Sequence, residues 1–335
     1  METIKATTYD ITIQTNSFQT VLKTVSKFSV DTYHLLIDEN VYAIYQDTIE
    51  SAFDASHYTT TIIPTGEHSK SFSMVESTIE TLIEKQIKRQ DYLVAIGGGV
   101  IGDLTGFIAS ILFRGVDYIQ VPTTLLAMVD SSVGGKTAIN ISKGKNLVGA
   151  FHSPKHVIID PMFLSTLPKK EHRSGLSEML KAGLIGDETI VTSLKASSEI
   201  DAALIARAIQ VKLQYVKQDY LDVGLRHTLN FGHTYGHAIE QFYNYEISHG
   251  EAVAQGMILA LKLGVTLGLT SQALCDEVIT LIESLCLTKD ISVDKKALMP
   301  YMKNDKKSAN DTIRFVFLQG YQKPIIKSIV WDDLR

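Results

Sequence analysis

This sequence of 335 residues has little cysteine, no excess of positive charge and no long apolar run without interruption. Its two cysteines, Cys275 and Cys286, lack C-x-x-C spacing, which indicates neither a disulfide framework nor a redox motif. We therefore expect a protein of the reducing cytoplasm, with both thiols packed in the core. The formal net charge of −5 argues against a general nucleic-acid-binding protein, so any basic site must be local.

A membrane span and an export signal are also not indicated by the sequence. The most apolar long segment, Val253 to Leu269, is interrupted by Gln255 and Lys262, which predicts a buried amphipathic helix. The first residues, METIKATTYD, contain no apolar stretch, so we expect no signal peptide. The composition, 45% hydrophobic and 21% charged, is that of a globular protein long enough for two domains.

The first 160 residues alternate strand signals with helix signals. Apolar segments with strand character occur at residues 9–15, 33–38, 58–64, 92–98, 117–123 and 156–160. Between two of them a helix is predicted from Ser71 to Arg89, with one apolar stripe formed by Val75, Ile79, Leu82, Ile83 and Ile87. This alternation predicts a Rossmann-like α/β domain over residues 1–160, with a largely parallel sheet.

The pattern changes near Asp160-Pro161, because the segments that follow are almost all helical. Helices are predicted at about residues 170–185, 187–197, 200–217, 226–243, 249–268 and 271–286. A short β-hairpin of IRFVFLQ and KPIIKSIV around Gly320 is expected near the end of the chain. Apart from this hairpin, residues 161–335 are interpreted as an all-α domain.

A glycine-rich segment, LVAIGGGVIGDLTGF, follows an apolar strand and precedes a helix. Gly97, Gly99 and Gly102 fit the G-x-G-x-x-G spacing, which lets backbone N–H groups approach a pyrophosphate. However, the motif follows about the fourth strand, and the acid expected about 20 residues later is missing. Asp38, at the end of an earlier strand, is the candidate ribose acid instead. The segment alone leaves nucleotide binding and a simple strand–helix turn equally open.

Two lysines in the middle of the chain stand beside glycines. Lys136 follows Gly-Gly, and Lys145 lies between a glycine and Asn146. Lysines in such polar loops suit a phosphate or carboxylate ligand, although a solvated surface charge is the alternative for each. GGKT resembles the end of a phosphate-binding P-loop, but Asp130 stands where that motif requires its first glycine, so we reject a P-loop.

The segment LNFGHTYGHAIE places His233 and His237 four residues apart, which puts both on one face of a helix. Two imidazoles so spaced bind zinc in metalloproteases, but Thr234 replaces the glutamate of that motif. Glu178 and His249 are further candidates, and one carboxylate with two imidazoles is a catalytic zinc arrangement. The spacing does not decide whether His237 or His249 joins His233. Ordinary hydrogen-bonded core or cap histidines are the alternative.

Basic residues occur in the same region of the sequence as these candidates. Lys181 lies three residues after Glu178, and therefore on the same helix face. Lys212 and Arg226 follow before the histidine motif. A metal site with cations around it indicates a small anionic substrate.

Six motifs together carry a resemblance to one family. They occur in the order GGGVIGDLTGF, VPTTLLAMVDSSVGGKTAIN, GKNLVGAFHSP, SEMLKAG, LNFGHTYGHAIE and HGEAVAQG, and they resemble the 3-dehydroquinate synthases. That family belongs to the sugar-phosphate cyclases and shares its fold with iron-type polyol dehydrogenases. The resemblance runs from about Asp38 to Asp305-Lys306-Lys307, which is nearly the whole chain.

The resemblance implies an NAD-dependent and zinc-dependent lyase of the shikimate pathway, with cobalt as an alternative metal. It implies conversion of 3-deoxy-D-arabino-heptulosonate 7-phosphate to 3-dehydroquinate and phosphate by transient oxidation, elimination, re-reduction and internal aldol closure. It further implies a cytoplasmic homodimer with no nucleic-acid or membrane partner. Residues 1–160 would bind NAD, and residues 161–335 would bind the metal and the substrate.

Individual roles are implied by the same motifs. The implied metal ligands are Glu178, His233 and His249. The implied NAD site comprises Asp38, Glu67, Lys70, Gly98, Gly99, Ile101, Asp103, Thr123, Thr124, Lys145, Phe163, Thr166 and Leu167. The implied substrate-binding residues are Asp130, Lys136, Asn146, Lys181, Lys212, Arg226, Asn230 and His237.

Arg114, His237 and Asn230 carry more specific expectations. Arg114 corresponds to an arginine that the family lends across a dimer interface to the substrate phosphate. His237 is expected to face that phosphate and to move protons at the leaving oxygen. Asn230 lies three residues before His233 and is expected on the same helix face.

One segment departs from the family's pattern D-E-x-E-x-G-x-R. Here the chain reads DYLDVGLR from Asp219 to Arg226, so Asp222 carries its charge on a shorter side chain than glutamate. The family's C-terminal catalytic lysine falls on Lys306 or Lys307, and the sequence does not choose between them.

Three other functions compete with this interpretation. A sister sugar-phosphate cyclase would share the NAD and metal motifs and differ in the residues that bind the substrate. A metal-dependent polyol dehydrogenase of the same fold would have no phosphate to bind and would release NADH. A non-catalytic regulator would have lost a metal ligand or the catalytic lysine, and none is lost here.

Overall fold

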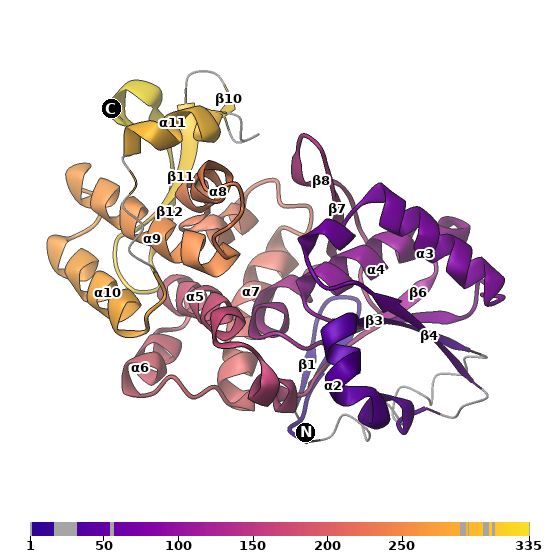
Figure 1. The fold of residues 1–335 in the computed structure, drawn as a ribbon. Helices are drawn as coiled ribbons and strands as arrows, with labels where there is room; N and C mark the ends of the chain where they lie inside the picture. The colour runs from indigo at the N-terminus through magenta and orange to yellow at the C-terminus, as the bar shows by residue number, and fades with distance from the viewer. Residues whose placement is uncertain are drawn as a thin grey trace. The chain divides into compact units, whose positions relative to one another are not determined.

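A computed structural model describes residues 2–16, 32–53, 57–288, 293, 295–303, 308–309 and 312–334 (Figure 1). The chain divides into two compact units, Met1–Leu167 and Pro168–Arg335. The boundary predicted at residues 160/161 lies shortly before this division, at the start of the 3₁₀ helix η4 (Pro161–Thr166). Each unit is described by itself below.

The first unit is built on a seven-stranded sheet in the order β1-β2-β9-β6-β5-β3-β4. Its strands are β1 (Glu2–Lys5), β2 (Asp10–Ile13), β3 (Tyr33–Asp38), β4 (Tyr58–Ile63), β5 (Tyr92–Gly97), β6 (Asp117–Pro122) and β9 (His156–Ile159). β1 and β2 pair in antiparallel fashion, and the other neighbours pair in parallel. The predicted largely parallel sheet is confirmed; β1 was not expected.

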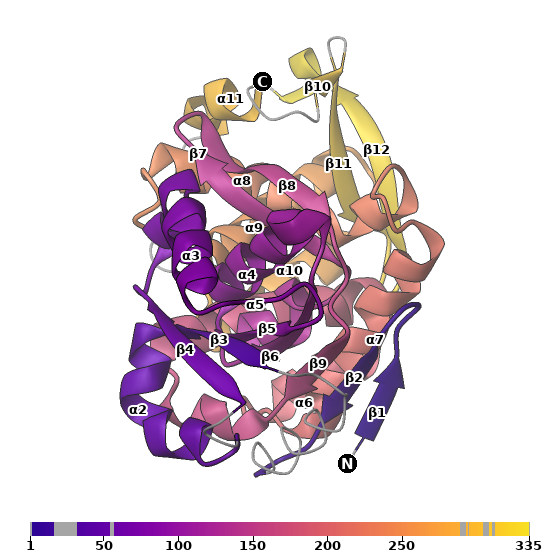
Figure 2. The same ribbon diagram turned by 90° about the vertical axis from the view of Figure 1, so that its right-hand side faces the viewer.

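Helices cover both faces of this sheet, which explains why its central strands are apolar throughout. α3 (Phe72–Glu84) and α4 (Gly99–Ile111) lie on one face, and α2 (Glu39–Glu50) lies on the other (Figure 2). In β5, Leu93, Val94 and Ile96 are fully buried. The face under α4 is the core of the unit, where Leu104 and Ile108 pack with the sheet.

The helix predicted over Ser71–Arg89 is shorter than expected. Ser71 is its N-cap and accepts a hydrogen bond from Met74 N, whereas the chain leaves the helix at Lys85 and turns at Gln86, whose φ is +60°. Val75 and Leu82 of the predicted stripe are buried, but Ile83 is 50% exposed, so its assignment to the stripe was wrong.

The two glycine–lysine segments do not form loops as predicted. They belong to a β-hairpin, β7 (Lys136–Ile141) and β8 (Gly144–Phe151), that pairs in antiparallel fashion. Thr137 and Ile139 are buried at alternate positions of β7, which is the strand periodicity that the neighbouring glycines and lysines obscured.

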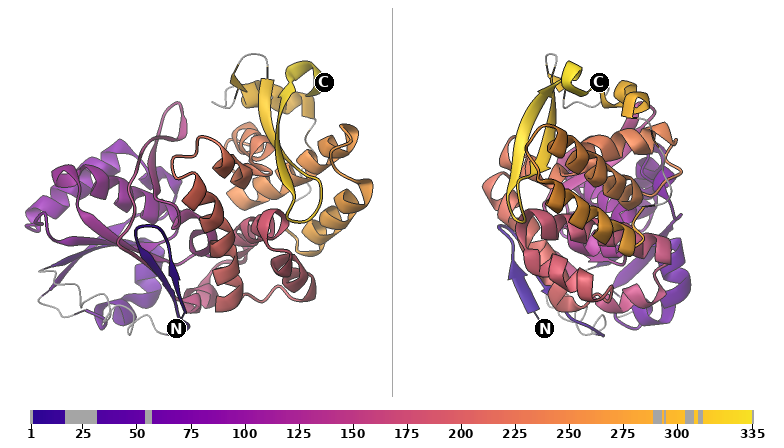
Figure 3. Two further views of the ribbon diagram at one scale, coloured as in Figure 1. Left: turned by 180° about the vertical axis from the view of Figure 1, so that it is seen from behind. Right: turned by 90° about the vertical axis from the view of Figure 1, so that its left-hand side faces the viewer.

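The second unit is mainly helical, with a small sheet at its end (Figure 3). Its helices are α5 (Lys169–Gly186), α6 (Glu188–Ala196), α7 (Ala202–Gln218), η5 (Leu225–Asn230), α8 (His233–Phe242), α9 (His249–Thr266), α10 (Gln272–Ser284), α11 (Lys295–Lys303) and η6 (Trp331–Leu334). β10 (Ser308–Ala309), β11 (Thr312–Leu318) and β12 (Pro324–Val330) form a three-stranded sheet. The predicted hairpin around Gly320 corresponds to β11 and β12.

The single helix predicted over residues 226–243 is broken in two. η5 ends at Asn230, and α8 begins at His233 after Gly232, whose φ is +81°. A Cβ at Gly232 would lie 2.6 Å from Met257 Cγ and 2.8 Å from Val253 O, so glycine also allows α9 to approach closely. The expectation that Asn230 shares a helix face with His233 was therefore wrong.

Two expectations about apolar segments have different outcomes. The run from Val253 lies in α9, where most residues through Gly264 are buried, as predicted. Within the described residues, no helix is both long and apolar enough to cross a membrane. Cys275 is buried in α10, but Cys286 is exposed at the turn after that helix with a φ of +51°, so its placement in the core was wrong.

Candidate active site

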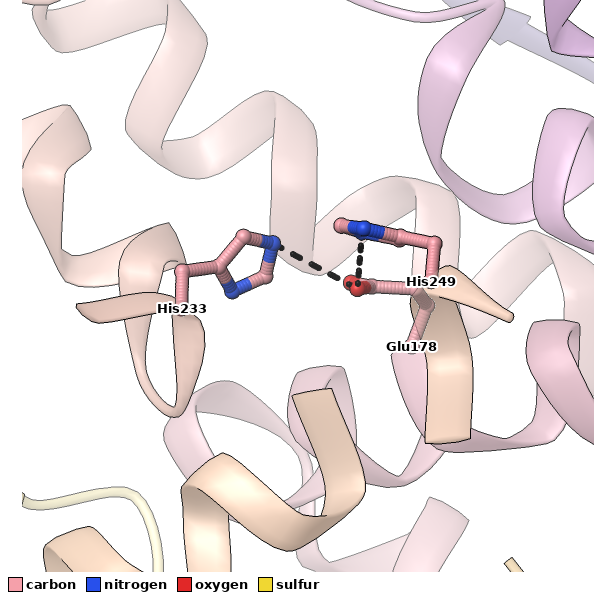
Figure 4. Close-up of side chains that lie close together, drawn as sticks. All are labelled: Glu178, His233 and His249. Atoms are coloured by element: carbon pink, nitrogen blue, oxygen red, sulfur yellow. Dashed lines mark ion pairs between the residues drawn. The ribbon is translucent and has the colours of Figure 1, made fainter. Parts of the chain in front are cut away.

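Glu178, His233 and His249 converge in the second unit (Figure 4). The Nε2 atoms of His233 and His249 lie 3.5 Å and 3.4 Å from Glu178 Oε1, and one ligand atom of each residue lies within 4.8 Å of the others. Of the two partners that spacing left open for His233, the fold brings His249 into this group. His237 lies beside His233, with 5.4 Å between the centroids of the two rings.

Each histidine stands at the first residue of a helix, where local structure fixes its backbone. His233 follows the left-handed Gly232. His249 follows Ser248, whose side chain accepts from the Glu251 backbone while the Glu251 side chain accepts from the Ser248 backbone. This capping box sets the direction in which α9, and with it the His249 side chain, leaves the preceding turn.

Glu178 comes from the fully buried middle of α5. A Cβ at Gly250 would lie 2.3 Å from the Ser174 Cα, so the start of α9 touches the backbone of α5 one turn before Glu178. This close approach, which only glycine permits, brings His249 to the carboxylate.

The carboxylate of Glu178 is 2% exposed, and neither oxygen accepts a hydrogen bond of normal geometry from the described residues. Burial alone would raise its pKa, but the ammonium of Lys181 and the imidazoles of His233 and His249 hold that pKa well below its usual range. Lys181 forms an ion pair with it, on the predicted shared helix face. An ionised, buried carboxylate of this kind is suited to a divalent metal.

The two imidazoles differ in their electrostatics. Burial, followed by the nearby Lys181, lowers the pKa of His233 well below its usual value, which keeps its ring neutral. Burial also acts to lower the pKa of His249, but its close contacts with the carboxylates of Glu178 and Glu240 outweigh burial and raise that pKa to about 10. A metal ion competes with this proton, because histidine coordinates as a neutral ligand. One carboxylate and two imidazoles fit zinc or cobalt.

Three predicted substrate-binding cations are buried in the same unit: Lys181, Lys212 and Arg226. Arg226 is held by the loop that precedes it, since its Nη1 donates to Tyr220 O over 2.6 Å. The Asp219 carboxylate accepts from the backbone N–H groups of Val223, Gly224 and Arg226. Asp219 therefore shapes this loop, a role that its place in the family pattern did not indicate.

The neighbouring residues Asn230 and Asp222 have different surroundings. Asn230 lines a cavity of about 20 Å³ together with His227, Thr234, Arg314 and Val316. The Oδ1 atom of Asp222, whose φ is +57°, lies 3.2 Å from the Nδ1 atom of His227.

Lys306 and Lys307, the two candidates for the C-terminal catalytic lysine, lie outside the described residues.

In the first unit, the glycine-rich segment forms the predicted strand–turn–helix. β5 ends at Gly97, Gly98 is the N-cap of α4, and no side chain caps the helix there. Cβ atoms at Gly98 and Gly99 would lie 3.0 Å from Thr124 Cγ2 and 2.9 Å from Ser131 Oγ. Glycine thus lets Thr124 and Ser131 approach the N-terminus of α4, whose uncapped backbone N–H groups suit an anionic ligand.

The strand order explains why the candidate ribose acid precedes the glycines in sequence. β3 pairs directly with β5, and a Cβ at Gly97 would lie 3.2 Å from the Cβ of Asp38. Oδ1 of Asp38 accepts from Asn40 N, from Val41 N and from Thr65 Oγ1, which caps α2 and fixes the carboxylate.

A buried lysine joins several predicted site residues of this unit. Lys70 Nζ donates over 2.6 Å to both Asp103 Oδ2 and Asn146 Oδ1, and lies 3.9 Å from Glu67. Burial acts to lower its pKa, but Asp103 and Glu67 outweigh burial and raise it. Asn140 Nδ2 donates to Glu67 Oε1, although the sequence did not indicate Asn140.

The FLSTL segment, with Phe163, Thr166 and Leu167, contacts a residue that sequence reasoning missed. The ring of Tyr45 packs edge-on against Phe163 at 4.9 Å, and its hydroxyl lies 2.8 Å from Thr166 Oγ1. Tyr45 interrupts α2 with a φ of −120°. The local sequence pattern does not predict this contact, because Tyr45 lies far from Phe163 and Thr166 in the chain.

The remaining predicted residues have the following places. Ile101 lies in the first turn of α4 and is fully buried, Thr123 follows β6, Asp130 lies in the π-helical turn η3 (Ala127–Ser131), Lys136 begins β7, and Lys145 lies in β8. Arg114, at the end of the 3₁₀ turn η2 (Leu112–Arg114), has a φ of +64° after Phe113 at +49°. All assigned site roles stay predictions.

The chain is similar to known proteins over most of its length. Residues 60–174 match the family model described as 3-dehydroquinate synthase N-terminal, and residues 175–308 match the one described as 3-dehydroquinate synthase C-terminal. A 3-dehydroquinate synthase of Sulfurovum sp. is 40% identical over 94% of this chain and 90% of its own. The 3-dehydroquinate synthase of Thermoanaerobacter pseudethanolicus is 38% identical over 99% of this chain and 97% of its own length.

Solved structures share the same fold. A 2-deoxy-scyllo-inosose synthase complexed with carbaglucose-6-phosphate, NAD⁺ and Co²⁺ has a TM-score of 0.87 at 25% identity, over 99% of this chain and 98% of its own. A probable glycerol dehydrogenase from Sinorhizobium meliloti has a TM-score of 0.64 at 15% identity, over 90% of each chain, and so shares the fold alone. The predicted fold class is confirmed.

Proposed function

This chain belongs to the 3-dehydroquinate synthase family, and on that premise we propose that it converts 3-deoxy-D-arabino-heptulosonate 7-phosphate to 3-dehydroquinate and phosphate in the shikimate pathway. The observation that carries the proposal is the convergence of Glu178, His233 and His249, with the buried Lys181 beside them. A metal centre with a cation at its edge suits a substrate that is both an alcohol and an anion.

Two cofactors complete the chemistry. Glu178, His233 and His249 would hold a zinc or cobalt ion, which would supply a Lewis acid to the substrate alcohol. The first unit would bind NAD, which would supply reversible hydride transfer at that alcohol, and oxidation of the alcohol makes the neighbouring proton acidic.

Residues of the first unit bind and orient NAD. Asp38 accepts hydrogen bonds from the ribose hydroxyls, while the uncapped N-terminus of α4 at Gly98 and Gly99 binds the pyrophosphate. Lys70 supports this site from the side, because its ammonium fixes the carboxylate of Asp103. Phe163, Thr166 and Leu167 form the far rim.

Residues of the second unit bind the anionic substrate. Lys181, Lys212 and Arg226 are buried cations, and their charge-assisted hydrogen bonds hold the phosphate and carboxylate. Asn230 orients the hydroxyl groups, and His237 holds a proton at the oxygen that leaves with phosphate. The family motifs also assign Asp130, Lys136, Asn146 and Lys145 of the first unit to substrate or cofactor binding. Fixing both anionic ends favours one conformation of the open chain, which promotes internal aldol closure.

The protein acts as a homodimer in the cytoplasm. The backbone of Arg114 and Phe113 is left-handed, a costly conformation for residues other than glycine that is typical of functional sites. This conformation supports the proposal that Arg114 reaches the substrate phosphate of a partner subunit.

The proposal is tested with purified protein, NAD and zinc against a panel of substrates. Phosphate release and NADH absorbance are measured with the heptulosonate phosphate and with glucose 6-phosphate, and NADH absorbance is measured with the heptulosonate lacking its phosphate. Release from the first alone, abolished by a chelator and restored by zinc or cobalt, is expected. Release from glucose 6-phosphate alone would assign a sister cyclase instead, and accumulation of NADH without phosphate would assign a polyol dehydrogenase.

A further inference from the structure

Glu240 lies against the side of His249 that faces away from Glu178. It stands in the last turn of α8, is 4% exposed, and its Oε2 atom is 3.2 Å from His249 Nδ1. The opposite ring nitrogen, Nε2, is 3.4 Å from Glu178 Oε1. The imidazole therefore lies between two buried carboxylates, one that belongs to the metal centre and one that does not.

The hydrogen bond at Nδ1 determines which nitrogen is available to a metal. If Nδ1–H donates to Glu240, the lone pair lies on Nε2, the atom that faces Glu178. His233 reaches the same state differently, since its Nδ1 is 3.2 Å from the backbone oxygen of Phe231. One histidine is thus supported by a neutral carbonyl and the other by a carboxylate, which makes the imidazole a stronger ligand.

The placement of Glu240 is unfavourable for the stability of α8 by itself. A carboxylate at a helix C-terminus opposes the macrodipole, and a buried carboxylate costs free energy unless it is paired. The backbone at His249 is already fixed by the capping box of Ser248 and Glu251. What that box leaves undetermined is the rotation and tautomer of the His249 ring, and Glu240 contacts the ring at the atom that decides both.

We propose that Glu240 is a positioning residue of the metal centre: through His249 Nδ1 it selects the tautomer and the ring orientation that present Nε2 to the metal. Glu240 itself touches neither metal nor substrate. This inference rests on the proposed metal centre and extends it to a residue whose effect is on metal affinity.

The test measures metal affinity directly, without substrate. Cobalt binding to the NAD-loaded protein is followed by competition with a chromophoric chelator and by the visible spectrum of bound cobalt. Glu240→Ala is expected to weaken binding about 10- to 100-fold and to alter the cobalt spectrum. Glu240→Gln, whose amide oxygen still accepts from Nδ1–H, is expected to lose less. At saturating metal, both variants are expected to recover most of the kcat of the parent protein, with the KM for the substrate unchanged.

Two controls separate positioning from general damage. Glu246→Gln makes the same substitution at an exposed glutamate between α8 and α9, and is expected to leave metal affinity unchanged. In a His249→Ala background, Glu240→Gln is expected to cause no further loss, because the ring that it orients is gone. An equal loss in both backgrounds would overturn the proposal, as would affinities within about twofold of the parent.

Failure of the proposed function has a different signature. If the parent binds cobalt and the Glu240 variants bind it weakly, the positioning role stands even when no phosphate is released from the heptulosonate phosphate. If Glu240→Ala does not fold, the isosteric Glu240→Gln and its double variant with His249→Ala carry the test alone. A parent that binds no metal overturns the positioning role together with the centre it serves.

Discussion

His233 and His237 are one helical turn apart on α8, but their replacement is expected to have different consequences. His233 lies with Glu178 and His249, so His233→Ala is expected to lose bound metal and activity together. His237→Ala is expected to retain metal and to lose activity by at least about 100-fold, as for removal of a proton-transfer group. Metal content and phosphate release are measured on the same samples. Two metal-free variants would show that both histidines of the turn bind the ion.

The metal affinity is expected to depend on pH through His249. Its folded-state pKa is raised to about 10, so a proton occupies the ring at neutral pH and must leave when metal binds. His233, with its pKa lowered, releases none. Binding therefore releases about one proton, and affinity should rise about tenfold per pH unit from pH 7 to 9. In chelator-treated protein, the stability that the His249 proton contributes to the folded state has the opposite pH dependence. This stabilisation is fully present below the pKa of the unfolded histidine and is lost as the pH rises through about 10.

Chelator competition at several pH values measures this slope. An affinity that does not change between pH 7 and 9 would contradict the assignment of the proton to His249. His249→Ala is the matched control, since its residual metal affinity should show no such slope.

At this scale the sequence predicted residue types better than contacts. The histidine spacing left two pairs of ligands open, and only the family motifs favoured His233 with His249. Glu240 and Tyr45 went unnoticed because each acts on a partner that the fold, and not the local pattern, brings near.

At the scale of elements, the break between η5 and α8 positions His233. Gly232→Ala is expected to destabilise the protein by more than about 2 kcal/mol, because it adds left-handed strain to the overlap with Met257 and Val253. Gly268→Ala is the control: its φ is +68° but a Cβ there would meet nothing within 4 Å, so strain alone should cost about 1 kcal/mol. Urea unfolding measures both. Equal losses would contradict the role of close packing at Gly232.

Apolar periodicity predicted the strands of the parallel sheet and most helices, because burial on one face or both leaves a clear pattern. It failed where two structures share a pattern. A 3₁₀ turn followed by an α-helix looks like one helix, which hid the break at Gly232. Glycine and lysine at the ends of β7 and β8 looked like loops, although Thr137 and Ile139 alternate as in a strand.

At the scale of the whole molecule, the proposed exchange of Arg114 between subunits can be tested by complementation. Arg114→Ala and Lys212→Ala are each expected to be nearly inactive. If Arg114 serves the partner's substrate, a mixed dimer has one doubly defective site and one intact site, and an equal mixture should regain about a quarter of parental activity. Mixed dimers without activity, or a monomer by light scattering, would contradict the exchange.

The two-part organisation was predictable because strand–helix alternation stops near residue 160 and continuous helix follows. The α/β unit and the helical unit are both present, and the second also carries the small sheet of β10 to β12. The convergence of α5, α8 and α9 at the metal centre depends on close approaches at glycines, which periodicity does not encode.

In the proposed reaction, NAD is used and regenerated within one catalytic cycle that releases phosphate. The most direct measurement supplies the heptulosonate phosphate with zinc and with NAD far below the substrate concentration, and follows phosphate and NADH absorbance together. The amount of phosphate released is expected to exceed the amount of NAD many times over, with no lasting NADH. Phosphate release that stops when the NAD has been converted to NADH would contradict it.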